Sequence, residues 1–228
     1  MAEFRNFLLL VGLASAATAV AGTLDFSTPN ICNGTLGPMQ PCSNNLFINQ
    51  SYGDTALVDV TYLDKYAQSH GSSLLSLKWY GTGYSDLPAV VFGGSGDPTG
   101  LSDDEIILTP VAGHTVTLTS FQLGSWGGSR QSHVEVLELG GGTLASYGVQ
   151  TMNPSPYIAS TFTPNVTSST GIIIHWWDTG YNVGADNIVF SADSGGSAVP
   201  EPASCALVSV GMVSLLGLAR GIRKSRKT

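Results

Sequence analysis

The stretch Thr115-Val116-Thr117-Leu118-Thr119 alternates strictly between hydroxyl-bearing and apolar side chains. Successive side chains of a β-strand point to opposite faces of its sheet, so we expect Val116 and Leu118 to face a core while the threonines face solvent. A sheet with one buried and one solvated face is typically antiparallel. The stretch therefore predicts an antiparallel strand in an all-β domain.

Seven further segments have the same character. They are short, rich in β-branched or aromatic residues, and separated by Gly, Pro, Asn and Ser. Together with 114–121, they lie at residues 56–63, 73–80, 89–92, 105–108, 133–139, 171–177 and 187–190. No long helix is predicted between them. So many strands in one domain favour an antiparallel two-sheet sandwich of the jelly-roll type over an open sheet with exposed edges, with a closed barrel as the alternative.

The N-terminal residues have the composition of a secretory signal peptide. Arg5 precedes the apolar run 7–13, and small residues ending in Ala19-Val20-Ala21 follow it. This order is typical of a signal peptide, and the apolar part is short for a membrane-spanning helix. We predict that residues 1–21 direct the chain to the Sec translocation machinery and are cleaved after Ala21. Cleavage after Ala19 and an uncleaved anchor are the alternatives.

The C-terminal residues predict one transmembrane helix. Residues 203–219 are uncharged, and five of the nine Lys and Arg residues follow them. As a helix, this segment spans roughly 25 Å of the ~30 Å hydrocarbon core, and snorkelling Arg and Lys side chains cover the difference. The positive-inside rule then keeps the basic tail 220–228 in the cytoplasm and places the upstream chain on the other side of the membrane.

The motif Val199-Pro200-Glu201-Pro202 precedes this helix. With the helix and the Arg-rich end, it resembles the PEP-CTERM sorting signal of exopolysaccharide-producing Gram-negative bacteria, over residues 199–227. That resemblance implies an exosortase, a membrane-embedded cysteine transpeptidase, as the partner that processes the chain near the motif. The protein is then anchored in the inner membrane before it reaches the cell surface or the extracellular matrix. A permanent type I membrane anchor, with the prolines only delimiting the helix, is the alternative.

One domain, residues 22–192, remains between the two ends, followed by a Ser/Gly-rich linker and the motif at 193–202. Between residues 22 and 198, three basic residues stand against fourteen Asp and Glu, so the net charge is 3 − 14 = −11. This acidity argues against nucleic-acid binding. Cys32 and Cys42 enclose a turn-rich loop and are predicted to form a disulfide in an oxidising compartment. Two free thiols or a metal-binding pair are the alternatives.

The segments Ile172-Ile173-Ile174-His175-Trp176-Trp177 and Ala185-Asp186-Asn187-Ile188-Val189-Phe190 resemble the closing strands of secreted lectin-like jelly rolls, such as carbohydrate-binding modules. In several of these families, the Asp that matches Asp186 helps to hold a structural Ca²⁺ against the N-terminal strand, which here implies Asp25 as its partner. Ca²⁺ requires about six to eight oxygen ligands, so two carboxylates are only part of a site. The alternative is an Asx turn at Asp186 and a solvated Asp25.

Two loop aromatics are the candidate ligand-binding residues. Trp126 and Tyr84 lie in Gly/Ser-rich segments. A pyranose ring packs its C–H face on such a ring while polar neighbours bond its hydroxyls. The alternative is that these rings fold back onto the edge of the sandwich. Trp176 and Trp177 lie in a strand-like run and are assigned to the core.

No catalytic residue is predicted. Asp193-Ser194-Gly195-Gly196 is similar to the nucleophile segment of trypsin-like proteases, but Ser/Gly-rich sequence does not preorganise an active site. The histidines lack the spacing of a zinc site. The sequence therefore predicts a non-catalytic surface or matrix protein that binds polysaccharide. A secreted glycoside hydrolase is the alternative, with two distant carboxylates such as Glu135 and Asp178 converging.

Overall fold

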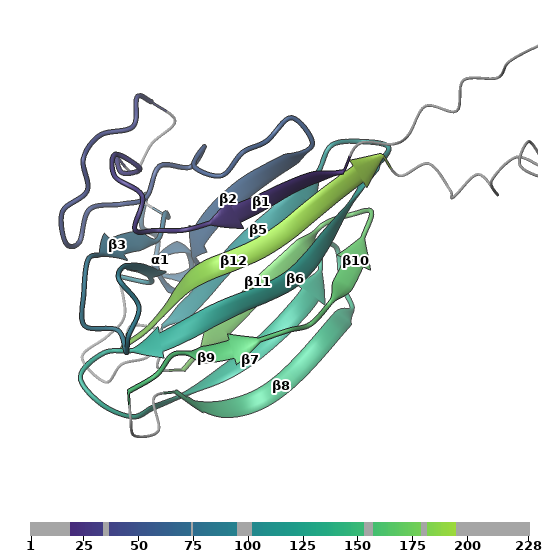
Figure 1. Ribbon diagram of the computed structural model, residues 1–228. Coiled ribbons are helices and arrows are strands. Elements are labelled where there is room, and N and C mark those ends of the chain that lie inside the picture. Colours follow the sequence, from purple (N-terminus) through teal and green to yellow (C-terminus); the bar gives the residue numbers. More distant parts are fainter. Residues whose placement is uncertain are drawn as a thin grey trace, which may run out of the picture. The chain divides into compact units, whose positions relative to one another are not determined.

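The computed structural model describes residues 19–33, 37–73, 75–94, 102–152, 157–178 and 182–194 (Figure 1). Most of the predicted signal peptide, the sorting motif, the predicted membrane helix and the basic tail lie outside these residues. In the part of the chain that is described, no helix is both long enough and apolar enough to cross a membrane.

The chain forms two antiparallel sheets, as predicted, and the described residues contain one short helix, α1 (Lys65–Ser69). The first sheet has the strand order β10-β6-β12-β4-β3, with β1 beside β12 and β9 beside β6. Its strands are β1 (Val20–Leu24), β3 (Lys78–Tyr80), β4 (Val90–Phe92), β6 (His114–Ser125), β9 (Ser160–Phe162), β10 (Val166–Ser168) and β12 (Val183–Ser194). The second sheet has the order β2-β5-β11-β7-β8. Its strands are β2 (Val58–Asp64), β5 (Asp103–Pro110), β7 (Arg130–Glu138), β8 (Thr143–Met152) and β11 (Ile172–Trp177).

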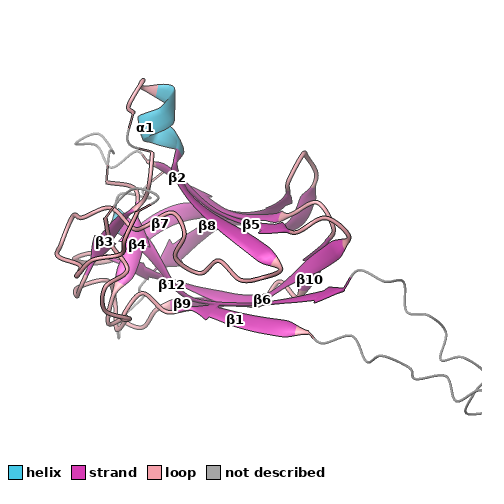
Figure 2. Ribbon diagram, turned by 90° about the horizontal axis from the view of Figure 1, so that it is seen from above, coloured by secondary structure: helices cyan, strands magenta, loops and turns pink. Residues whose placement is uncertain are grey.

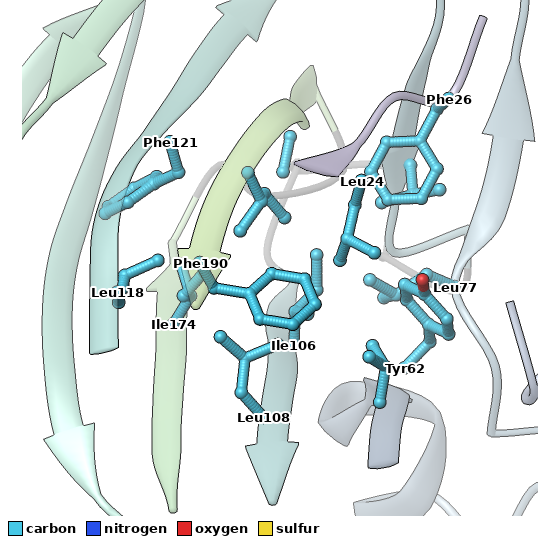
Figure 3. Close-up of a cluster of buried hydrophobic side chains, with 14 of the residues drawn as sticks. Leu24, Phe26, Tyr62, Leu77, Ile106, Leu108, Leu118, Phe121, Ile174 and Phe190 are labelled. Atoms are coloured by element: carbon cyan, nitrogen blue, oxygen red, sulfur yellow. The ribbon is translucent and has the colours of Figure 1, made fainter. Parts of the chain in front are cut away.

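The two sheets pack face to face as a β-sandwich, and Figure 2 shows them as two layers. Side chains from both inner faces form one core. In Figure 3, Leu118 and Phe190 of the seven-stranded sheet meet Ile106 and Ile174 of the five-stranded sheet. Burial of these apolar side chains is the main favourable contribution to folding.

The alternation predicted for residues 115–119 is confirmed in β6. Val116 and Leu118 are fully buried, whereas Thr119 is exposed. The pairing of β6 with β12 then shifts register next to Asn187, whose φ is +51°. Asn tolerates this left-handed conformation better than most residues, and a bulge here changes which side chains of both strands face the core.

The outer edge of β2 is covered by side chains from the loop that precedes it. Gln50 Nε2 donates to Tyr62 O (2.8 Å), and Gln50 Oε1 accepts from Tyr62 N (3.1 Å). Asp54 Oδ1 accepts from Val60 N (2.8 Å). These bonds satisfy backbone groups that a strand edge otherwise offers to another chain.

Paired strands extend past both ends of the predicted domain, residues 22–192. β1 begins at Val20, two residues before the predicted mature N-terminus, and pairs Val20 with Ala192 of β12. At the other end, β12 continues to Ser194, which pairs with His114 of β6. Asp193 and Ser194 therefore belong to the sheet and not to the linker, because backbone pairing with a long neighbour continues past the last apolar residue.

The predicted disulfide between Cys32 and Cys42 is confirmed, so the readings as two free thiols or a metal-binding pair are wrong. Cys32 is fully buried in the main core. Its N–H donates to Gln40 O (3.1 Å), and its O accepts from Gln40 N (2.8 Å). The disulfide thus closes a segment that hydrogen bonds already bring together.

Removal of this disulfide is expected to destabilise the protein by roughly 2–3 kcal/mol, since the oxidised unfolded chain has fewer conformations. The measurement is urea unfolding of the oxidised protein, the reduced protein and the double variant Cys32→Ser/Cys42→Ser. Reduction of the double variant serves as the control and should change nothing. Equal stability of all four samples contradicts this expectation.

Candidate ligand-binding site

Trp126 lies at the turn between β6 and β7, at the end of the sandwich where β12 begins (Figure 1). The turn continues through Gly127 (φ +64°) and Gly128 (φ +143°), backbone conformations that glycine adopts without a steric cost. Ser125 Oγ donates to Gly128 O (2.6 Å) and closes the turn. The Trp126 residue is 37% exposed, so a large aromatic ring stands at the surface.

Neighbouring groups fix the position of the Trp126 ring. A β-carbon at Gly83 would lie 2.2 Å from Trp126 Cζ3, so the indole lies directly against the Gly83 backbone. Tyr80 meets the indole edge to face, with ring centroids 4.8 Å apart. The backbone N–H of Trp126 donates to Asn182 O (2.8 Å). A ring held in this way loses little conformational entropy when a ligand binds.

Tyr84 does not share the exposure of Trp126. It is only 4% exposed and belongs to a small core with Leu87, Val90 and Phe92. Its ring centroid lies 5.5 Å from that of Trp126. The expectation that Tyr84 offers a ring face to solvent is therefore wrong, because the segment folds back onto the sandwich. Tyr84 supports Trp126 from beneath.

Two exposed apolar residues that the sequence analysis missed border the same small core. Tyr157 and Ile158 are 59% and 54% exposed. The next residue, Ala159, packs in that core, and its N–H donates to Asp86 Oδ1 (2.7 Å). The signal in the sequence was an aromatic residue directly after Pro154-Ser155-Pro156, a composition typical of a surface turn. We call Tyr80, Tyr84, Trp126, Tyr157 and Ile158 the aromatic end.

Polar groups accompany the aromatic end. Arg130 Nε donates to Trp126 O (3.4 Å), which places a guanidinium beside the turn. Ser85 Oγ accepts from Ser125 N (3.0 Å), and Asp86 is exposed. A guanidinium, a hydroxyl and a carboxylate beside an aromatic ring are the kinds of group that bond sugar hydroxyls.

A second aromatic group lies on the outer face of the five-stranded sheet. Trp177 is stacked by His133 (ring centroids 4.7 Å apart) and by His175 (4.4 Å). Trp176 is fully buried and faces the core, as predicted. The prediction that Trp177 also belongs to the core is wrong, because its side chain lies on the outer face. The period of two from Ile172 onward was the missed signal, since it puts Trp176 inside and Trp177 outside.

Each histidine of this stack bonds a carboxylate. His133 Nδ1 bonds Asp178 Oδ2, and His175 Nε2 lies 2.6 Å from Asp103 Oδ1. Glu135 is the register partner of His175. The carboxylates of the glycosidase alternative are thus connected through β7, because Asp178 bonds His133, two residues before Glu135. The bond between Asp178 and His133 orients the His133 imidazole.

Asp186, the predicted calcium ligand, is fully buried in β12. Its Oδ1 accepts from Phe26 N (3.0 Å), so it joins the last strand to the chain just after β1. Its Oδ2 has no hydrogen-bond partner. Burial raises the pKa of Asp186 to about 6, the N–H groups of Phe26 and Asn187 oppose this change, and the charge of Asp25 adds to it.

Asp25 has a local role. Its Oδ1 accepts from Ser27 N (2.9 Å) and from Ser27 Oγ (2.6 Å), which is a turn formed with its own backbone. Among the residues described, no three His, Cys, Asp or Glu are grouped so that they could hold a metal ion. Asp186 and Asp25 alone do not supply the about six to eight oxygens of a Ca²⁺ shell. Calcium here stays a prediction.

We expect Asp186 to destabilise the protein as the pH rises through about 6. Its pKa is raised in the fold, so the neutral form is the one that the fold favours. The stabilisation is complete below about pH 3.9 and is lost through the folded pKa, with a difference of about 1–3 kcal/mol. Urea unfolding across this pH range should show a smaller loss in Asp186→Asn than in the wild type.

Millimolar Ca²⁺ distinguishes the metal prediction in the same experiment. If an ion binds Asp186, Ca²⁺ stabilises the wild type above pH 6 and has no effect on Asp186→Asn. If Ca²⁺ leaves the urea unfolding curves of the wild type unchanged, the prediction of a calcium site at Asp186 is wrong. A wild-type stability that is constant through this pH range contradicts the assignment of a raised pKa to Asp186.

Comparisons with known proteins do not establish a family. No protein-family model matches the chain, and no curated protein matches it. A solved structure described as "CBM4 structure and function" aligns with 60% of this chain and 83% of its own, at 19% identity and a TM-score of 0.27. A TM-score this low supports no statement about fold or function.

Proposed function

We propose that the β-sandwich binds an extracellular polysaccharide without cleaving it, with Trp126 as the ring on which a sugar packs. The observation that carries this proposal is a Trp ring that is 37% exposed and yet held against Gly83 and Tyr80. Exposing a large aromatic ring to water is unfavourable in free energy, and a bound ligand covers that surface. Because the ring is already fixed in position, binding loses less conformational entropy. Tyr157, which is 59% exposed and lies two residues before Ala159 of the small core, is proposed as a second ring for the ligand.

The charge of the domain favours a neutral ligand. The net charge of residues 22–198 is 3 − 14 = −11. Two of the three basic side chains make contacts elsewhere, since Lys65 Nζ lies 2.9 Å from Glu105 Oε1 and Lys78 Nζ donates to Gly94 O (2.9 Å). A polyanion is repelled by the remaining field. A neutral polysaccharide fits better than a uronate-rich or sulfated one.

The proposed place of action is outside the cytoplasm. Most of the sequence signals for export and for exosortase sorting lie in residues that the structure does not describe. The disulfide between Cys32 and Cys42 supports them, because such bonds persist in oxidising compartments. The protein then acts at the cell surface or in the extracellular matrix of a Gram-negative bacterium, after anchoring in the inner membrane.

The binding proposal is tested by retention of the purified protein on immobilised polysaccharides. Neutral glucans, xylan and chitin form one group, and alginate is the anionic comparison. We expect retention on at least one neutral polymer and weaker retention on alginate. Release of reducing ends from a bound polymer, lost in Glu135→Gln or Asp178→Asn, would instead favour the glycoside hydrolase. Failure to retain the protein on any polymer contradicts the proposal.

The export proposal has its own measurement, which is mass spectrometry of the protein from its native host. Because Val20 pairs with Ala192 in β1, cleavage after Ala19 keeps the first strand whole, whereas cleavage after Ala21 removes two paired residues. We therefore expect Val20 as the mature N-terminus and loss of the chain beyond the Pro-Glu-Pro motif. An intact chain with Met1 and Thr228 in the cytoplasmic fraction contradicts export.

A further inference from the structure

Two buried aspartates lie at the end of the five-stranded sheet where α1 follows β2. Figure 2 shows α1 at this end of β2. Asp64 is the last residue of β2, and Asp104 of β5 is its register partner. Both are fully buried. Asp64 lies two residues after the buried Tyr62, and Asp104 lies two residues before the buried Ile106, so both side chains face the core side of the sheet. Side chains directly opposite in an antiparallel pair have Cβ atoms about 4.5–5.5 Å apart. The two carboxyl groups can therefore reach one shared proton.

Each carboxyl group holds a different segment of the chain. Asp64 Oδ1 accepts from Ala67 N (2.8 Å) and so caps the N-terminus of α1. Asp104 Oδ2 accepts from Gly93 N (3.0 Å), just after β4, and from Ser102 Oγ (3.1 Å), just before β5. We call these segments, with the two aspartates, the aspartate corner.

One oxygen of Asp104 has no partner. Its Oδ1 is buried and makes no hydrogen bond. A β-carbon at Gly93 would lie 1.8 Å from this atom, so the Gly93 backbone closes against it. A buried polar atom without a partner costs free energy, and an ionised one costs more. A proton on the pair would give this oxygen a hydrogen bond.

The charged groups that act on Asp104 are acidic. They are Asp64 across the strand pair and Asp103 beside it in the chain. Asp103 Oδ1 lies 2.6 Å from His175 Nε2 on the outer face. On the other side of Asp104, its register partner in β11 is Trp176, whose Nε1 donates to Val183 O (3.1 Å).

The nearest lysines along the chain are engaged with other groups. On α1, Lys65 Nζ lies 2.9 Å from Glu105 Oε1. On β3, Lys78 Nζ donates to Gly94 O (2.9 Å). Within the described ranges, the partners of Asp104 are the N–H of Gly93 and the hydroxyl of Ser102 and include no basic side chain, so a proton is the simplest positive charge that can offset Asp104.

We propose that Asp64 and Asp104 share one proton and that this proton closes the aspartate corner. With the proton present, the pair carries one negative charge, which the N–H groups of Ala67 and Gly93 bond. When the proton leaves, two ionised carboxylates repel each other at buried positions, and the corner opens. The pKa of Asp104 agrees with this, because burial first and the charge of Asp64 second raise it well above its ordinary value.

The direct test is an NMR pH titration of the full chain that follows the amide signals of Ala67 and Gly93. We expect both signals to move in one transition well above pH 4, and we expect Asp104→Asn to abolish that transition at Gly93. Asp59→Asn removes an exposed carboxylate from the same strand and should change neither signal. Signals that titrate only near the ordinary Asp value of about 3.9 overturn the proposal.

Thermal unfolding supplies a second readout. A raised folded pKa means that the stability contributed by Asp104 is present at low pH and lost as the pH rises through that pKa, here a Tm decrease of roughly 3–6 °C. Asp104→Asn should remove the part of the decrease that Asp104 contributes, whereas Asp186→Asn should keep that part. If Asp104→Asn keeps the wild-type decrease, or if millimolar Ca²⁺ shifts both amide signals at neutral pH, the pair does not work by sharing a proton.

Discussion

Replacement of Trp126 by alanine is expected to abolish polysaccharide retention while the fold persists. The variant removes an exposed ring at a central position of the aromatic end, and such anchors contribute about 2 kcal/mol or more to binding. This corresponds to a loss of affinity of roughly 30-fold or more. Some stability should be lost, because the ring packs against Gly83, Tyr80 and Tyr84, but the separate main core is untouched and the fold should persist.

Matched variants make this result specific. Trp126→Phe keeps a ring on Gly83 and should retain part of the affinity. Tyr157→Ala removes the second exposed ring and should weaken binding less. Trp177→Ala alters an aromatic group on the other sheet and should leave retention at the aromatic end unchanged. If Trp177→Ala removes binding and Trp126→Ala does not, the ligand lies on the outer face of the five-stranded sheet.

Replacement of Trp176 by alanine is expected to destabilise the protein by about 3–5 kcal/mol, the usual cost of removing a fully buried aromatic side chain. Trp176 has no exposed surface, and its Nε1 donates to Val183 O (3.1 Å), so the variant leaves both a cavity and an unpaired carbonyl. The neighbouring Trp177→Ala should cost less than about 1 kcal/mol, because its side chain lies on the outer face.

Urea unfolding of both variants measures this difference. Should Trp176→Ala fail to fold, Trp176→Phe keeps most of the volume and is expected to fold with reduced stability. Equal losses for Trp176→Ala and Trp177→Ala contradict the register of β11, since a shift by one residue exchanges the buried and exposed faces.

Several elements of the fold could be predicted because their signal is local. The alternation around Val116 and Leu118 depends only on the period of a strand, and it holds in β6. The disulfide between Cys32 and Cys42 depends only on two cysteines around a short, turn-rich loop. The outward direction of Trp177 also follows from the period of two in β11, although the prediction for this residue was the core.

Other elements carry a weak local signal. β8 (Thr143–Met152) was missed because Ala, Ser and Gly interrupt its apolar residues. It lies at the edge of its sheet, where one neighbour and partial solvation suffice for pairing. β1 was missed because Val20 and Ala21 fit a cleavage signal equally well. β1 pairs with β12, the last strand of the domain, so no local segment of the sequence indicates this pairing.

The sequence by itself determined that this chain is built from strands, that two of its cysteines pair, and that its domain is acidic, since periodicity, loop closure and charge are properties of local segments or sums over them. Only the tertiary structure decided that Trp126 stays at the surface while Tyr84 is buried beneath it. It also decided that Asp64 faces Asp104. Both outcomes depend on which segments distant in sequence pack together. The residues that flank each of these side chains in the sequence do not predict that packing.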